Sequence, residues 1–433
     1  MIWNEEFECM ALEDLKNFQS ERLARIASYV YTNCPVYKAK FDAAGVCPGD
    51  IRSIDDIVKL PFTTKDDMRD NYPFGLFSVH TKHVSAIHVS SGTTGNPTLV
   101  GYTKDDIELW SDVVARALCC AGAEPGDRIQ NAYGYGFFTG GLGLHYGAMA
   151  MGLTVIPISS GQTKRQLKIM QDLQPRILSC TPSYALYIAE EARDMGLDPR
   201  QSSWQIGMFG AEPWSEAIRR DIEEELNLLA TDIYGLSEII GPGVSQECTY
   251  KDGLHVFSDV FFPEIIDPAT NQPAAEGADG ELVITTLTKQ AIPLIRYRTR
   301  DIVGMNNARC RCGRTSPRLS KIKGRTDDMI VVKGINVFPS QIEGVLMGID
   351  GVGHQYQIVV DRKSHGLDEV EVLVEVEESI FSDEVKVLGE LQKKIKNQID
   401  AVLSVGVKVT LVEPKTIERS MGKSKRLIDR RTL

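Results

Sequence analysis

Apolar and polar positions follow two different periods along the first hundred residues. Between residues 12 and 31, apolar side chains return every three or four positions, which predicts helix. Apolar and polar residues alternate from 84 to 89, and residues 99–102 form a short, mostly apolar run, so both are predicted strands. Residues 90–98 between them are mostly serine, threonine and glycine, which predicts a loop.

Strand and helix patterns then alternate through the middle of the chain. Thr103 is a suitable N-cap for a helix over 104–121, and strands are predicted to begin near 129, 154, 177 and 207. This alternation predicts an α/β fold with right-handed crossovers. Ligands of such sheets bind beyond the carboxyl ends of the strands, and glycine-rich turns follow several of these strands.

The pattern becomes richer in strands after residue 281 and changes again after 324. From there, the predicted order is strand, helix, strand, strand, helix, strand (329–332, 339–347, 356–360, 369–376, 384–402 and 407–412). This order resembles a small ferredoxin-like α+β domain. A chain of 433 residues is too long for one ordinary core. We therefore expect a large multi-sheet α/β domain over 1–326 and a smaller, mobile domain over 327–433.

Composition excludes some classes of function. The formal net charge is −11, which argues against general nucleic-acid binding. The first residues show no signal-peptide pattern. Glycines interrupt the longest apolar stretch, 133–158, which favours packed core over a membrane span. Nine irregularly spaced cysteines are typical of a reducing compartment, so we expect a cytoplasmic protein.

The loop after the first predicted strand has the chemistry of a phosphate site. Glycines allow positive φ, successive backbone N–H groups can form an anion-binding concavity, and hydroxyls add donors. The alternative is a hairpin turn without a ligand. The loop is not a Walker A sequence, because no Lys-Ser or Lys-Thr follows its last glycine.

The sequence Ser-Ser-Gly-Thr-Thr-Gly-Asn-Pro-Thr resembles the phosphate loop of the adenylate-forming superfamily. Four short motifs follow in the order of that superfamily, at 234–238, 296–301, 324–328 with 333–334, and 422–426. Each alone has an ordinary explanation: a solvated glutamate, a charged edge strand, a polar hinge or a basic tail. Two positions depart from the pattern, Asn96 where lysine is usual and Arg300 where glycine is usual.

Several runs resemble the phenylacetate–CoA ligases within that superfamily (90–103, 131–141, 210–214, 285–301 and 336–343). The resemblance implies the following nucleotide-binding residues: Ser90, Ser91, Gly92, Thr93, Thr94, Gly95, Gly210, Ala211, Glu212, Pro213, Asp232, Tyr234, Gly235, Ser237, Asp301 and Arg325. It implies an acid-binding pocket formed by Tyr135, Phe137, Gly210, Ala211 and Pro213. Glu238 is the implied Mg²⁺ ligand, and Lys423, Arg325 and Asp327 are the implied catalytic residues.

The implied reaction converts an arylacetate, ATP and coenzyme A into the thioester, AMP and diphosphate. Lys423, or its neighbour Lys425, serves adenylation, and rotation at Asp327 opens the second step. The expected partners are these small molecules, with no nucleic acid or membrane, in a homodimer. Three alternatives stay open: an adenylyltransferase that never uses CoA, a ligase for another aryl or indolyl acid, and a nonenzymatic nucleotide-binding protein.

A second set of residues could bind zinc. Cys248, His255, Cys310 and Cys312 provide three thiols and one imidazole, which suits tetrahedral Zn²⁺. Four protein ligands leave no open position, so the predicted role is structural. The alternative is a group of buried thiols without metal.

Overall fold

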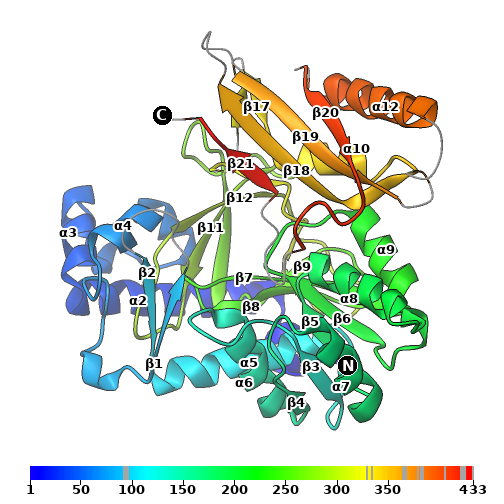
Figure 1. Ribbon diagram of the computed structural model, residues 1–433. Coiled ribbons are helices and arrows are strands. Elements are labelled where there is room, and N and C mark those ends of the chain that lie inside the picture. The colour runs from blue at the N-terminus through cyan, green and yellow to red at the C-terminus, as the bar shows by residue number, and fades with distance from the viewer. Residues whose placement is uncertain are drawn as a thin grey trace. The chain divides into compact units, whose positions relative to one another are not determined.

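The computed structural model describes residues 1–90, 97–327, 330–332, 335–362, 368–377, 380, 385–403, 406–419 and 426–431. The chain divides into two compact units (Figure 1). Unit 1 comprises Met1–Cys180, Ser202–Ala211 and Leu228–Lys321, and unit 2 comprises Thr181–Gln201, Glu212–Asn227 and Ile322–Leu433. The predicted boundary between 326 and 327 stays a prediction.

Helices occupy the first seventy residues of unit 1, as the periodicity predicts. They are α1 (Glu5–Glu8), α2 (Leu12–Asn33), α3 (Pro35–Ala44) and α4 (Lys65–Asp70), with short 3₁₀ turns at Pro48–Asp50, Ile54–Lys59 and Thr81–His83. One face of α2 is buried through Leu15, Leu23, Ile26 and Val30, at helical spacing.

A nine-stranded sheet forms the centre of unit 1, in the order β13-β14-β9-β8-β7-β6-β5-β3-β4. Its strands are β3 (Arg128–Asn131), β4 (Thr154–Ile156), β5 (Ile177–Cys180), β6 (Ile206–Gly210), β7 (Leu229–Leu236), β8 (Gly241–Glu247), β9 (Leu254–Val256), β13 (Met305–Asn306) and β14 (Arg318–Leu319). Pairing is parallel from β4 to β7 and antiparallel from β7 to β13. The parallel half confirms the α/β fold that the alternating pattern predicts.

Helices α5 (Lys104–Cys120) and α6 (Thr139–Met151) pack against each other and against β8 (Figure 1). The sequence pattern did not predict α6, because glycine disfavours helix interiors. Its glycines serve close packing instead. A Cβ atom on Gly143 would lie 2.3 Å from the Trp110 ring of α5. Helix α7 (Thr163–Leu173) follows β4.

Two smaller antiparallel arrangements complete unit 1. Strands β1 (Ala86–Ser90) and β2 (Thr98–Tyr102) form a hairpin, with Ser90 opposite Thr98. Strands β10 (Phe261–Ile266), β11 (Gly280–Thr286) and β12 (Tyr297–Val303) pair in that order. The loop predicted to bind phosphate therefore joins the two strands of a hairpin.

Unit 2 contains α8 (Pro182–Asp194), α9 (Glu216–Leu226) and the C-terminal elements. These elements are β15 (Gly324–Arg325), β16 (Ile330–Val332), β17 (Ile335–Val337), α10 (Pro339–Leu346), β18 (Val352–Arg362), β19 (Asp368–Val376), α12 (Val385–Leu403), β20 (Lys408–Val412) and β21 (Leu427–Asp429). A 3₁₀ turn at Pro199–Gln201 follows α8. The predicted order of strands and helices is present.

The pairing within unit 2 was not visible in that order. The four-stranded sheet runs β20-β19-β18-β21, whereas β16, the first predicted strand, pairs with β17 in a separate hairpin. Helices α10 and α12 pack together, and buried residues of both helices share one core with the sheet (Figure 1). Periodicity identifies elements, but it does not state which strands exchange hydrogen bonds.

Candidate active site

Strand β1 ends beside the aromatic loop that follows β3. The carbonyl oxygen of Phe137 accepts hydrogen bonds from the backbone N–H of Val89 at 3.0 Å and from Nδ1 of His88 at 3.2 Å. Ser90 thus lies next to residues predicted to line the acid pocket. Ser91, Gly92, Thr93, Thr94 and Gly95 fall outside the residues that the structure describes.

Tyr135 is held from two sides, whereas Phe137 is not covered. The Tyr135 hydroxyl accepts a hydrogen bond from Nδ2 of Asn131 at 2.8 Å and lies 3.1 Å from Nδ1 of His145. Burial raises the pKa of Tyr135 to about 12 and lowers the pKa of His145. The Phe137 side chain is 72% exposed. Tyr135 is therefore a fixed wall, and Phe137 is a ring available to a ligand.

The end of β6 is shaped by a close approach to β7. A Cβ atom on Gly210 would lie 2.2 Å from the carbonyl oxygen of Ile233, so only glycine fits there. Ala211 follows with φ of 70°, a left-handed conformation that is strained for alanine. Strained backbone at a strand end is common at ligand sites, and both residues are in the predicted nucleotide and acid sites.

Residues at the end of β7 contact both α6 and β12. The Tyr234 hydroxyl donates to Oδ2 of Asp301 at 2.6 Å, and the Ser237 hydroxyl lies 2.9 Å from that of Thr139, the first residue of α6. Asp232, on the same strand, donates its backbone N–H to Glu247 at 2.9 Å. These contacts bring together predicted site residues from three separate segments of unit 1.

Two lysines contact Glu238 within the described part of the chain. Nζ of Lys65 lies 3.3 Å from the Glu238 carboxylate. Lys289 donates to the carbonyl oxygens of Ile239 at 2.7 Å and Glu238 at 3.4 Å. Burial lowers the pKa of Lys289 to about 8. Glu238, the predicted metal ligand, is thus a nearly buried carboxylate in a cationic environment.

The remaining predicted residues belong to unit 2 or are not described. Oε1 of Glu212 accepts the backbone N–H of Ser183, near the start of α8, at 2.8 Å. Pro213 follows it in the chain. Nε of Arg325 donates to Oδ1 of Asp327 at 3.0 Å, so these two predicted catalytic residues are paired with each other. Lys423 falls outside the described residues.

The four predicted zinc ligands lie together in unit 1. Their ligand atoms all lie within 4.8 Å of one another. Sγ of Cys312 is 3.4 Å from Nε2 of His255, and Sγ of Cys248 is 3.8 Å from that of Cys310. Nδ1 of His255 is 3.3 Å from the Ser316 hydroxyl, a partner that can fix the ring and leave Nε2 for a metal.

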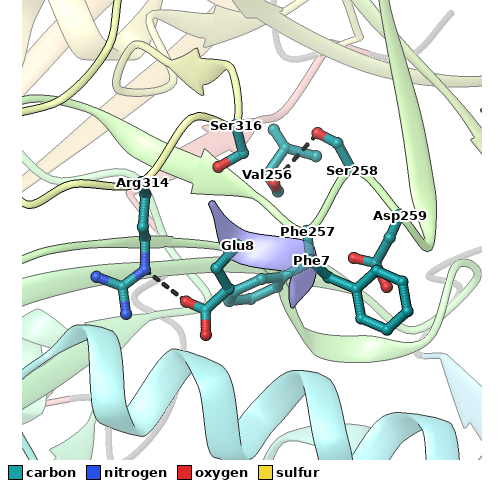
Figure 2. Close-up of a pocket in the computed structure, with 8 residues that line it drawn as sticks. All are labelled: Phe7, Glu8, Val256, Phe257, Ser258, Asp259, Arg314 and Ser316. Atoms are coloured by element: carbon teal, nitrogen blue, oxygen red, sulfur yellow. Dashed lines mark hydrogen bonds and ion pairs between the residues drawn. The ribbon is translucent and has the colours of Figure 1, made fainter. Parts of the chain in front are cut away.

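A small pocket beside this cluster contains none of the predicted site residues (Figure 2). In Figure 2, Arg314 points toward Glu8, and Nε of Arg314 donates to Oε2 of Glu8 at 2.5 Å. Ser316, which contacts His255, lies on the same wall. An ion pair whose charges already neutralise each other offers little to an anionic ligand. The pocket is therefore a packing feature of the N-terminal segment.

Comparisons with known proteins agree with this geometry. Residues 49–288 match the family model for AMP-binding enzymes, and residues 334–431 match the model for their C-terminal domain. The phenylacetate–coenzyme A ligase of Thermus thermophilus is 49% identical, over 100% of both chains. The Escherichia coli enzyme of that name is 45% identical, over 98% of this chain and 97% of its own. The chain belongs to the phenylacetate–coenzyme A ligase family.

This member of the phenylacetate–coenzyme A ligase family also resembles a solved structure closely. The crystal structure of 2-hydroxyisobutyryl-CoA ligase in complex with R3-HIB-AMP matches with a TM-score of 0.93 and 28% identity, over 99% of this chain and 92% of that one. The predicted adenylate-forming fold is confirmed. No helix among the described residues of this family member has the length and apolar character needed to cross a bilayer.

Sequence reasoning missed several contacts of this ligase site. Lys65, Lys289 and His145 belong to no motif, and lysine and histidine occur on many surfaces without a function. The one signal available was Asn96, which leaves the phosphate loop without a cation. That absence predicts that a basic residue from elsewhere in the chain serves the phosphates.

Proposed function

We propose that this protein ligates phenylacetate, or a related arylacetate, to coenzyme A through an acyl-adenylate. The observation that carries the proposal is the 49% identity over the full length of a curated phenylacetate–coenzyme A ligase. The contacts among Tyr234, Asp301 and Glu238 support it, because they gather the motif residues of unit 1 in one region. The protein is an AMP-forming acid–thiol ligase.

In the first half-reaction, the acid carboxylate attacks the α-phosphorus of ATP and diphosphate leaves. All reacting groups are anionic, so positioned cations and donors matter more than a base. Asp301 is suited to accept the ribose hydroxyls, and its Tyr234 partner fixes the carboxylate orientation. Lys423 is the proposed contact of the carboxylate and the α-phosphate.

Glu238 fits the role of Mg²⁺ ligand. Its carboxylate is 8% exposed and already has a cation 3.3 Å away, so the site favours positive charge. A magnesium ion bound there supplies charge neutralisation for the phosphates. Glu238 itself holds that charge at the end of β7, close to the Tyr234 and Ser237 contacts.

In the second half-reaction, the CoA thiol attacks the acyl carbon and AMP leaves. The proposed hinge is Asp327, where rotation withdraws Lys423 and admits the thiol. The Arg325–Asp327 pair is exposed enough to exchange partners, because both side chains are 31% exposed. Arg325 can then reach phosphate oxygens.

The proposed acid pocket contains Tyr135, Phe137, Gly210, Ala211 and Pro213. The fixed Tyr135 ring and the exposed Phe137 ring are apolar surfaces that suit an aryl group. The glycine at 210 lets the backbone approach a ligand closely.

We further propose that Cys248, His255, Cys310 and Cys312 bind one structural zinc ion. Three sulfur donors and one imidazole are the ligand types that tetrahedral zinc prefers. Three of the four residues are buried and all four are within reach of one centre, which supports a closed site without a water position.

A screen for CoA-dependent AMP release against a panel of carboxylic acids tests the proposed function. Thioester with phenylacetate supports it, and preference for another aryl or indolyl acid would change the substrate. AMP transfer without CoA would support the adenylyltransferase alternative. Sedimentation of the purified protein tests the expected homodimer, and cell fractionation tests the expected cytoplasmic location.

A further inference from the structure

The same four residues begin two helices of unit 1. Thr64-Lys65-Asp66-Asp67 begins α4, and Thr103-Lys104-Asp105-Asp106 begins α5. In each, the threonine hydroxyl accepts the backbone N–H of the second aspartate, and that aspartate accepts the threonine N–H. Local sequence builds one cap twice, so any difference between the two lysines comes from tertiary structure.

The two lysines differ in the carboxylate that each one meets. Nζ of Lys65 lies 3.3 Å from Oε1 of Glu238, and the side chains are 27% and 8% exposed. Nζ of Lys104 lies 3.6 Å from Oε1 of Glu108, and those side chains are 83% and 67% exposed. Solvent screens the exposed pair more strongly. Lys104 is an ordinary surface cation, whereas Lys65 belongs to the environment of the predicted metal ligand.

The backbone before Lys65 is fixed to the segment that leads into β12. Thr63 donates its N–H to the carbonyl oxygen of Arg296 at 3.0 Å and accepts the N–H of Arg298 at 2.9 Å. Asp66 lies 3.8 Å from the Arg300 guanidinium on β12, next to Asp301. Lys65 is therefore placed by rigid elements, between the strand that carries Asp301 and the turn that carries Glu238.

The phosphates of ATP need cations, and residues 90–98 contain no lysine or arginine. Lys289 also lies at Glu238, but it is buried and its ammonium is used by two carbonyl oxygens and the Tyr102 ring. Lys65 keeps part of its surface exposed and has one carboxylate partner at the site. A partly exposed ion pair costs little to exchange, so Lys65 can move to a phosphate.

We propose that Lys65 binds the β- or γ-phosphate oxygens of ATP and supplies the cation that the phosphate loop lacks. This assignment rests on the proposed function. Lys65 leaves Glu238 for the phosphates when ATP binds, and it returns when diphosphate leaves. Lys289 holds the backbone at Glu238 throughout.

Binding of ATP and of AMP to the full-length protein, measured by calorimetry with Mg²⁺ and without acid, tests this role. AMP lacks the β- and γ-phosphates. Lys65→Met should weaken ATP binding about 10- to 100-fold, the effect of losing one charge-assisted hydrogen bond. AMP affinity should stay within about twofold of wild type, because the rest of the site is unchanged. The reverse reaction should show a raised KM for diphosphate.

Two further variants separate a phosphate contact from a structural role. Lys104→Met, the matched control, should bind ATP as wild type does, and Lys65→Arg should restore most of the lost ATP affinity. Wild-type ATP affinity in Lys65→Met would overturn the role of Lys65. Equal loss of ATP and AMP would also overturn it, because the lysine would then support the fold around Glu238. Failure of the unmodified protein to bind either nucleotide would instead overturn the proposed function.

Discussion

The region at the end of β7 and the Cys/His cluster both gather polar side chains from distant segments, but they hold them differently. In the first region, Glu238 pairs with a lysine and Asp301 with a tyrosine hydroxyl. In the Cys/His cluster, four ligand atoms face one another and three of the four residues are buried. The first set consists of groups that can exchange partners for a ligand, and the second forms a closed set.

The difference separates turnover from stability. Exchanging a partly exposed ion pair costs about 1 kcal/mol or less, which suits a site that binds and releases nucleotide in every cycle. A closed thiolate and imidazole set binds metal far more strongly and contributes that energy to folding. Variants in the two regions should therefore affect different measurements.

The largest expected effect comes from Lys423→Ala, on the turnover side of the comparison. Acyl-adenylate formation should fall about 100- to 1000-fold, the cost of one preorganised charge contact. Thioester formation from supplied acyl-adenylate should survive. Separate assays of the two half-reactions measure this, with Lys425→Ala as the control. Equal loss in both half-reactions would contradict the assignment of Lys423 to adenylation.

A second effect on turnover is expected from Asp327→Pro. Proline fixes φ near −65°, so the second half-reaction should slow by about tenfold or more relative to the first. Asp327→Ala is the control, because it removes the carboxylate that pairs with Arg325 without fixing φ. If Asp327→Pro performs both half-reactions at wild-type rates, the hinge lies elsewhere.

On the stability side, Cys310→Ser should remove the zinc. The wild-type protein should contain about one zinc ion per chain without added metal. The variant should lose that zinc, and its unfolding midpoint should fall by about 5 °C or more. Acid preference should stay unchanged. The control is Cys47→Ser, at an exposed cysteine outside the cluster.

Elemental analysis and thermal unfolding decide this prediction together. Metal-free wild-type protein of full stability would mean that the four residues are ordinary buried side chains. Retention of zinc by Cys310→Ser would mean that another ligand set binds it.

The sequence predicted the two regions to different depths for a chemical reason. Cysteine and histidine are rare and few other roles bring four of them together, so the cluster could be proposed from residue types alone. Asp301 and Glu238 were found because they end short motifs. Lys65 could not be found that way, because the identical cap at Lys104 meets only surface. Its role depends on a contact between residues 173 positions apart.

The fold divides along the same line. Periodicity predicted β1, β2, α5 and the C-terminal order of elements, because each follows from local spacing. It missed α6, whose glycines are explained by a close neighbour, Trp110. It also could not assign β16 to the hairpin with β17.

The smallest expected effect is at Arg300, beside the nucleotide region. Its φ of 68° is strained for arginine and suits the glycine that is usual in this motif. Arg300→Gly should stabilise the folded protein by about 0.5 kcal/mol, since relief of strain exceeds the added entropy of the unfolded chain. Chemical denaturation measures this. Arg300→Ala keeps the strain and should show no gain. A clear loss of stability in Arg300→Gly would show that contacts of the arginine side chain outweigh the strain.

Isolation of the intermediate tests the central claim most directly. The protein is mixed with ATP, Mg²⁺ and phenylacetate without CoA, quenched, and examined by mass spectrometry before and after CoA is added. The account predicts enzyme-bound phenylacetyl-adenylate and diphosphate first, and then conversion of the adenylate into phenylacetyl-CoA and AMP. Absence of the adenylate, or release of its AMP to another acceptor regardless of CoA, would contradict the account.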